Sequence, residues 1–273
     1  MKKLIKLSNS DKASILEFLS KQDMVKYMFL VSDIEGYDLE TKDVALYVSK
    51  DNDLVENIFL CFYGNLVVFY QKDNFDLNQL KDIMTEYQIK NAICQPEFIP
   101  VLEKLASQLN KTVEINRETI MTLDKAEFDQ IKAQYPNLEA TLIVEKDLAP
   151  IIESRKQIKE FNNFSAQALD LNYLLKSLNN GYYGGYVIYK DNKVVSHASY
   201  IAKNQKAATI GGVFTLEDYR RKGYSKDCVI KLCDDLLNKN ITPTLFFDNP
   251  VAGKMYYSLG FKDYGTIIVG LLK

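Results

Sequence analysis

Histidine is almost missing from this chain of 273 residues, which contains only His197, and tryptophan is absent altogether. Metal sites built on His-x-x-x-His need two histidines, so the sequence excludes them. A Ser-His-Asp triad would have to use His197, yet no Gly-x-Ser-x-Gly elbow is present to hold a nucleophile. His197 lies within a predicted strand, from Lys193 to Ile201, where we expect a structural or incidental role. The sequence therefore predicts no metal site and no serine hydrolase.

Cysteine is also scarce, and the four cysteines, Cys61, Cys94, Cys228 and Cys233, form no disulfide framework for a chain of this size. Cys228 and Cys233 are five residues apart and lie near the apolar stripe of one predicted helix. A small apolar side chain in that place favours core packing over metal binding.

Neither positive nor negative charge dominates, because 34 basic and 36 acidic residues leave a net charge of −2. No apolar run is long enough to span a membrane, and Lys6 and Asp11 interrupt any signal-like segment near the start. We therefore expect a cytoplasmic protein with neither a nucleic-acid nor a membrane partner. A hydrophobic content of 47% is enough for a real core, and the length suits one large or two modest domains.

The two halves of the chain show a similar order of predicted elements. In the second half, a hairpin around Asp191-Asn192 precedes a strand from Ala207 to Thr215 and an amphipathic helix. In the first half, a hairpin around Gly64-Asn65 is likewise followed by an amphipathic helix. Residues 124–138 are charged and contain a Pro-Asn breaker, so we expect them to separate domains 1–125 and 138–273.

One stretch of the second half points to a ligand. A predicted strand ends in Val213-Phe214-Thr215, and a loop then leads through Arg220-Arg221-Lys222-Gly223 into a helix that starts at Tyr224-Ser225. Free backbone N–H groups at a helix start, with basic side chains beside them, form a site for phosphate or diphosphate. Gly223 allows close approach of the backbone and an unusual φ. The stretch predicts a site for a nucleotide-like cofactor, and a solvated basic turn is the alternative.

Residues 140–273 resemble the GNAT superfamily of acyl-CoA N-acyltransferases. The segment Arg220 to Ser225 looks like the family's Arg/Gln-x-x-Gly-x-Gly/Ala motif for coenzyme A, with Ser225 in the last Gly/Ala place. The segment Asn249 to Phe261 looks like the family's Asn-x-x-Ala-x-x-Leu-Tyr-x-x-Leu-Gly-Phe block. Each block is moderately specific, and their order and spacing strengthen the resemblance.

The resemblance implies an α/β (mixed α+β) fold of two GNAT-like domains, each a mostly antiparallel twisted sheet flanked by helices. It implies acetyl-CoA as co-substrate, held by Val213, Phe214, Thr215, Arg220, Arg221, Lys222, Gly223, Tyr224, Ser225 and Asn249. Within that set, a backbone N–H near Val213 is expected to polarise the thioester carbonyl, and Asn249 to contact the pantetheine arm. Tyr256 matches the family's general acid, although its helical spacing with Ala252 and Leu259 also suits a core residue.

The expected function is transfer of an acetyl group to a primary amine of a small molecule or peptide, by direct attack in a ternary complex. A non-catalytic acyl-CoA sensor or interaction module is one alternative, and an aminoacyl-tRNA-dependent ligase is another. Glu217 and Asp218 are candidate bases for the amine, or simply solvated loop charges. The acceptor is not predicted, and the oligomeric state stays open, with a homodimer among the options.

The first half departs from the family pattern. Its own helix is preceded by Gln71-Lys72-Asp73-Asn74-Phe75-Asp76, which lacks glycine and carries two acids that would repel a diphosphate. We therefore expect an N-terminal domain without a cofactor site. Two-domain chains of this kind resemble a group of bacterial GNAT acetyltransferases with a degenerate N-terminal domain.

Overall fold

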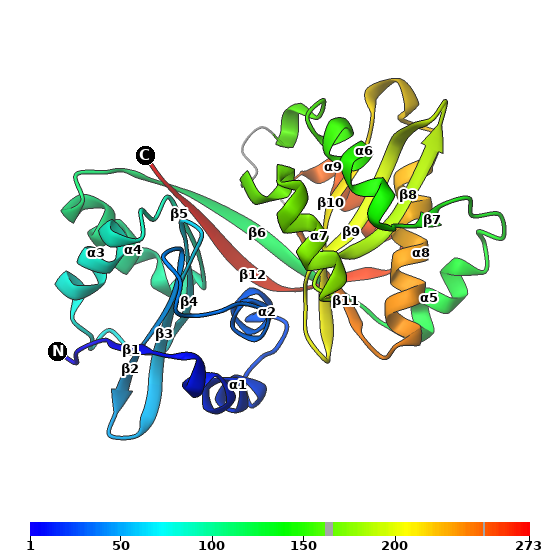
Figure 1. Ribbon diagram of the computed structural model, residues 1–273. Coiled ribbons are helices and arrows are strands. Elements are labelled where there is room, and N and C mark those ends of the chain that lie inside the picture. Colours follow the sequence, from blue (N-terminus) through cyan, green and yellow to red (C-terminus); the bar gives the residue numbers. More distant parts are fainter. Residues whose placement is uncertain (162–165, 248) are drawn as a thin grey trace. The chain divides into compact units, whose positions relative to one another are not determined.

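The computed structural model describes residues 1–161, 166–247 and 249–273 (Figure 1). Contacts divide the chain into two units: unit 1 contains Met1–Ile120 and Tyr264–Lys273, with residues 246–247, and unit 2 contains Met121–Leu245 and Asn249–Asp263. The predicted second domain, 138–273, includes Tyr264–Lys273, whereas the structure places these residues in unit 1. Residues 124–138, expected as a connection, contain the helix α5 (Lys125–Lys132) in unit 2.

In unit 1 the strands follow the order β1-β2-β3-β4-β5-β12-β6, and among the pairings from β1 to β12 only β4–β5 is parallel. Its strands are β1 (Ile5–Leu7), β2 (Val44–Asp51), β3 (Leu54–Phe62), β4 (Asn65–Tyr70), β5 (Asn91–Cys94), the later part of β12 (Phe261–Leu272) and most of β6 (Val113–Leu123). Its helices are α1 (Lys12–Ser20), α2 (Met28–Gly36), α3 (Leu77–Glu86) and α4 (Ile99–Gln108).

The sheet of unit 1 is buried on both faces. Successive residues of a strand point to opposite faces, and Phe59 and Leu60 of β3 accordingly belong to two different core clusters. The cluster of Phe59 includes Leu80 of α3, and the cluster of Leu60 includes Leu30 of α2. Helices therefore cover each face of the sheet, and the strands contain long apolar runs instead of alternating polarity.

Glu56 of β3 carries a buried carboxylate with three partners in unit 1. It lies 2.8 Å from each of Lys2 Nζ, Lys72 Nζ and Asn74 Nδ2. Hydrogen bonds from Lys2, Lys72 and Asn74 lower the pKa of Glu56 from 4.5 to about 2, and the bond from Lys2 contributes most. Because the folded pKa is below the unfolded one, this carboxylate stabilises the fold above pH 4.5 and loses that effect as pH falls towards 2.

We expect Glu56→Gln to lower the melting temperature at pH 7. The melting temperature of this variant should also fall less between pH 5 and pH 3 than that of the unaltered protein. Thermal unfolding of both proteins, followed by circular dichroism across this pH range, measures the effect. Asp53→Asn, in the exposed turn before β3, is the control for loss of one negative charge. Parallel pH curves for the Glu56→Gln variant and the unaltered protein would contradict the assignment.

In unit 2 the strands follow the order β7-β8-β9-β10-β11, in which only β10 and β11 are parallel. Its strands are β7 (Thr141–Leu142), β8 (Gly184–Lys190), β9 (Lys193–Lys203), β10 (Ala207–Thr215) and β11 (Thr242–Phe247), the last two residues of which belong to unit 1. Besides α5, its helices are α6 (Leu148–Arg155), α7 (Leu171–Asn179), α8 (Tyr224–Asn238) and α9 (Pro250–Ser258).

Helices α6 and α8 pack on opposite faces of β9 (Figure 1). Ser196 of β9 faces Cys228 of α8, and the next residue, His197, faces the side of Arg155 of α6. Cys228 and Cys233 are buried free thiols in the apolar face of α8, as predicted. The tight hairpin between β8 and β9 also agrees with prediction, because Asp191 and Asn192 have φ of 50° and 60°.

Candidate functional site

The candidate site begins where β10 and β11 stop pairing. Their parallel register covers residues 207–209 against 242–244, and the hydroxyl oxygens of Thr209 and Thr244 lie 3.1 Å apart at its end. β10 continues to Thr215, so within the described residues its later half has no pairing with β11. The main chain along such an edge can pair with an extended ligand.

β10 bulges in this same half. Its register against β9 shifts so that Gly212 and Val213 together oppose one residue of β9. Gly212 has a φ of 60°, which favours glycine. A Cβ atom on Gly212 would lie 3.1 Å from Nη2 of Arg155 and 3.4 Å from Cε1 of His197. Both the backbone conformation and the space around it therefore favour glycine at this position.

Side chains of β9 bind the carbonyl oxygens of the bulge. The three hydrogen bonds are Ser199 Oγ to Gly211 O (3.2 Å), His197 Nδ1 to Gly212 O (2.7 Å) and Ser196 Oγ to Phe214 O (2.8 Å). They replace ladder bonds that a bulged strand loses. His197 is fully buried, and burial together with the Arg155 cation holds the pKa of its imidazole well below the usual value. His197 is thus a neutral core residue that is hydrogen-bonded to β10.

The loop between β10 and α8 contains the predicted coenzyme A motif. Arg220, Arg221, Lys222 and Gly223 are all exposed, and Tyr224 is the first residue of α8. Gly223 is the N-cap with a φ of 84°, and no atom lies within 4 Å of where its Cβ would be. The first N–H groups of a helix of 15 residues thus emerge beside three basic side chains and an open glycine.

Interactions within the loop fix its path. Arg220 Nε donates to the carbonyl oxygen of Thr215 at 3.1 Å, which ties the loop to the end of β10. The ammonium group of Lys222 lies over the ring of Tyr219, 5.3 Å from its centre. Glu217 and Asp218 are exposed in the 3₁₀ turn that follows the strand, so their roles as base or as loop charge both stay open.

Helix α9 carries the two other predicted residues. Asn249 is its N-cap and accepts from the Val251 N–H at 2.9 Å through Oδ1, while its NH₂ group is a separate donor. Tyr256 is 7% exposed and packs edge-on against Phe261, and burial raises the pKa of its phenol to about 12. Tyr257 is exposed and bonded to Asp263, so it faces away from Tyr256.

The start of α8 and helix α9 lie next to each other. Ser225 Oγ donates to the sulfur of Met255 at 3.6 Å, and Tyr256 lies close enough to Cys233 of α8 for the thiol to affect its pKa. By contrast, no hydrogen bond between described residues joins Arg221 or Lys222 to Asn249. The predicted residues thus fall into two groups, one on the β10–α8 segment and one on α9, which meet at Ser225.

The sequence did not predict the group of hydrogen-bonded side chains that contacts the bulge at Gly212. Arg155 of α6 and Tyr183, just before β8, join His197 there, and each comes from a different element. Periodicity within one element cannot bring such residues together. The only local signal was the Gly211-Gly212 pair inside a predicted strand, which is typical of a bulge.

The helix start in unit 1 that corresponds to α8 is occupied by its own side chain. Asp76 is the N-cap of α3 and accepts from the N–H groups of Asn78 and Gln79 at 3.0 and 3.1 Å. A carboxylate therefore already occupies the place where a diphosphate would have to bind.

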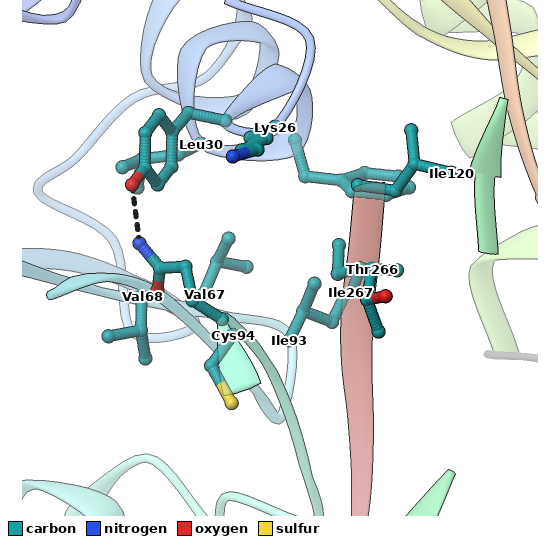
Figure 2. A pocket seen from close by; sticks show the side chains of 12 residues that line it. Lys26, Leu30, Val67, Val68, Ile93, Cys94, Ile120, Thr266 and Ile267 are labelled. Atoms are coloured by element: carbon teal, nitrogen blue, oxygen red, sulfur yellow. Dashed lines mark hydrogen bonds between the residues drawn. The ribbon is translucent and has the colours of Figure 1, made fainter. Parts of the chain in front are cut away.

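Unit 1 also has parallel strands that stop pairing early, at residues 65–67 of β4 and 91–93 of β5. Figure 2 shows a pocket beside them, lined mainly by apolar side chains. Gln95 follows β5 there, and its amide lies 2.7 Å from the hydroxyl of Tyr27. With its amide oxygen turned towards Tyr27, the same side chain also donates to Val68 O at 3.1 Å and accepts from Tyr70 N at 3.3 Å. Gln95 thus binds the main chain of β4 where pairing with β5 has ended.

The part of the chain that the structure describes contains no group of three or more His, Cys, Asp or Glu side chains able to hold a metal ion. None of the helices in these residues has the length and apolar character needed to cross a membrane.

The mixed strand arrangement of each unit, the early-ending parallel pairs and the strand-loop-helix segment define a two-unit protein of the GNAT superfamily. A family model described as GNAT acetyltransferase matches residues 45–267. The chain belongs to this family, since the match spans most of its length. A comparison with curated protein sequences finds no match.

Solved structures share the fold over the whole chain. A GCN5-related N-acetyltransferase-like protein from Streptococcus suis is 17% identical, with a TM-score of 0.61 and coverage of 96% of this chain and 100% of that one. A tandem GNAT protein from the clavulanic acid biosynthesis pathway is 11% identical, with a TM-score of 0.61 and coverage of 98% and 97%. A GNAT acetyltransferase from Colwellia psychrerythraea is 13% identical, with a TM-score of 0.56 and coverage of 98% of both chains. The predicted fold class and superfamily are confirmed.

Proposed function

We propose that this chain is an acetyl-CoA-dependent N-acetyltransferase with one cofactor site, in unit 2, and that it acts on a primary amine of a small molecule or peptide. The observation that carries the proposal is the open helix start at Gly223, which a short loop connects to a strand whose parallel pairing has ended. Family membership supports the reaction type.

The residues present suit coenzyme A. A diphosphate carries negative charge, which the N–H groups at the start of α8 and the side chains of Arg221 and Lys222 can bind. The pantetheine arm is extended and contains amides, and the unpaired edge of β10 around Val213 to Thr215 offers main-chain partners for them. The NH₂ group of Asn249 supplies a further donor on α9.

In the proposed reaction the amine nitrogen attacks the thioester carbon, a C–N bond forms and the C–S bond breaks. The Val213 N–H donates to the carbonyl oxygen, where negative charge develops. The Tyr256 phenol gives its proton to the departing thiolate, and its raised pKa of about 12 keeps that proton in place at neutral pH. The proton lost by the amine passes to water, with Glu217 or Asp218 as the candidate base.

We expect isothermal titration with acetyl-CoA to give one binding site per chain. Unit 1 should not contribute a second, because Asp76 occupies its helix start and Gln95 binds the strand edge. A stoichiometry of two would contradict the single-site proposal, and absence of any binding would contradict the proposed function as a whole.

A panel of amines, incubated with protein and acetyl-CoA, tests catalysis. Release of the free thiol of coenzyme A, together with a mass increase of the amine by one acetyl group, is the expected result. Binding of acetyl-CoA without transfer to any amine would favour the non-catalytic sensor. Retention on immobilised tRNA at about 150 mM salt would favour the ligase.

A further inference from the structure

We infer that Arg155, Tyr183 and His197 form a directed chain of hydrogen bonds that fixes and polarises the Gly212–Val213 peptide, and so strengthens the Val213 N–H as a donor to the acyl carbonyl. The inference rests on the proposed function and identifies three positioning residues for that site. None of them needs to touch the substrate.

The direction of the hydrogen bonds follows from the chemistry of each group. Gly212 O can only accept, so the neutral ring of His197 carries its proton on Nδ1, 2.7 Å away. Nε2 is then an acceptor, and the Tyr183 hydroxyl, 2.9 Å away, must donate to it. The Tyr183 oxygen in turn accepts from Nη2 of Arg155 at 3.2 Å. All three bonds therefore point the same way, from the cation to the carbonyl of Gly212.

This chain of bonds is buried and its members are held in place. Arg155, Tyr183 and His197 are 5%, 4% and 0% exposed. Arg155 is also anchored through Nη1, which donates to Ala168 O at 2.9 Å. The imidazole of His197 stacks on the ring of Phe214, with centres 5.3 Å apart. Bonds in series polarise one another, and a buried site strengthens the effect.

The effect reaches Val213 because the two atoms concerned belong to one peptide group. A trans peptide is planar, with its C=O and N–H pointing in opposite directions. The imidazole of His197 binds the Gly212 oxygen, so the Val213 N–H points away from that ring. The pairing of β10 with its neighbour β11 has already ended at Thr209, so within the described residues no ladder bond joins Val213 to β11. In the proposed complex this N–H lies at the open edge of β10, where the thioester binds.

The carbonyl stretch of bound acetyl-CoA, measured by isotope-edited infrared difference spectroscopy, reports on this donor without requiring an acceptor. We expect it to lie below that of free acetyl-CoA in the unaltered protein. In Tyr183→Phe and His197→Leu it should move back towards the free value, while the Kd for acetyl-CoA changes less than about threefold. His197→Asn can place an amide N–H near the position of Nδ1 but loses the acceptor for Tyr183, so it should retain more of the shift than His197→Leu but less than the unaltered protein. With an amine from the panel, kcat should fall about tenfold in the first two variants, less than for complete loss of such a donor.

Tyr189→Phe is the matched control. It also removes one phenol hydrogen bond, 2.8 Å long, to Asp147 in the same unit, but that bond has no link to β10. Thermal unfolding verifies that each variant is folded, and Tyr183→Phe, which keeps the ring, is the mildest of them. A carbonyl shift that is absent, or that stays unchanged in Tyr183→Phe, would overturn the inference while leaving binding intact. Failure of the unaltered protein to bind acetyl-CoA would overturn both the inference and the proposed function.

Discussion

Gly223→Asp is expected to weaken acetyl-CoA binding at least about a hundredfold. The new carboxylate would lie at the start of α8, where the diphosphate of coenzyme A is proposed to bind. Repulsion between the two over a few ångströms amounts to roughly 3–4 kcal/mol in a partly solvated site, which corresponds to two or three orders of magnitude in Kd. Isothermal titration at low and high salt measures the loss, and salt should reduce it by screening the charges.

Gly223→Asn separates charge from backbone strain. Asparagine has nearly the same shape as aspartate and tolerates the φ of 84° comparatively well. No atom lies within 4 Å of the expected Cβ position, so neither side chain meets a clash at its first atom. We expect the asparagine variant to keep most of the affinity. Equal Kd values for the two variants would show that no diphosphate binds at this helix start.

Tyr256→Phe is expected to lower kcat by roughly tenfold to a thousandfold, with little change in the Kd for acetyl-CoA. The variant removes the proton that the phenol would give to the departing thiolate but keeps the ring against Phe261. Since burial raises the pKa of Tyr256 to about 12, the phenol stays protonated across the range of an ordinary assay. Any loss of activity between pH 7 and pH 10 must then come from another group.

Single-turnover measurements with an amine from the panel isolate the chemical step for this test. Tyr257→Phe is the matched control, since Tyr257 is the next residue, is exposed and bonds to the exposed side chain of Asp263. We expect it to leave kcat unchanged. A Tyr256→Phe variant as fast as the unaltered protein, with chemistry limiting the rate, would assign Tyr256 to the core of unit 2 alone.

Local chemistry made much of unit 2 predictable. Asp191 and Asn192 mark a hairpin because both tolerate positive φ, and Asn249-Pro250 marks the start of α9 because one caps the helix and the other suits its first turn. The strand-loop-helix around Gly223 was visible for the same reason, as each residue acts on its neighbours in sequence.

Contacts between distant residues were not predictable. Arg155 and Gly212 are separated by two strands and a helix, and neither has a local pattern that indicates the other. Gln95 looks like an ordinary loop residue after a short strand, although its amide binds the main chain of β4. Such contacts depend on how elements pack, so a single sequence does not reveal them.

The placement of Tyr264–Lys273 affects how the protein is made. β12 pairs with β5 between Ile268 and Leu271, and Ile268 is fully buried in the core of unit 1. A ribosome would therefore synthesise all of unit 2 before the strand that completes unit 1 becomes available. Until then β5 presents an open edge, a hazard for aggregation of the nascent chain. Unit 1, most of which is synthesised first, can therefore complete its folding only after unit 2 has been synthesised.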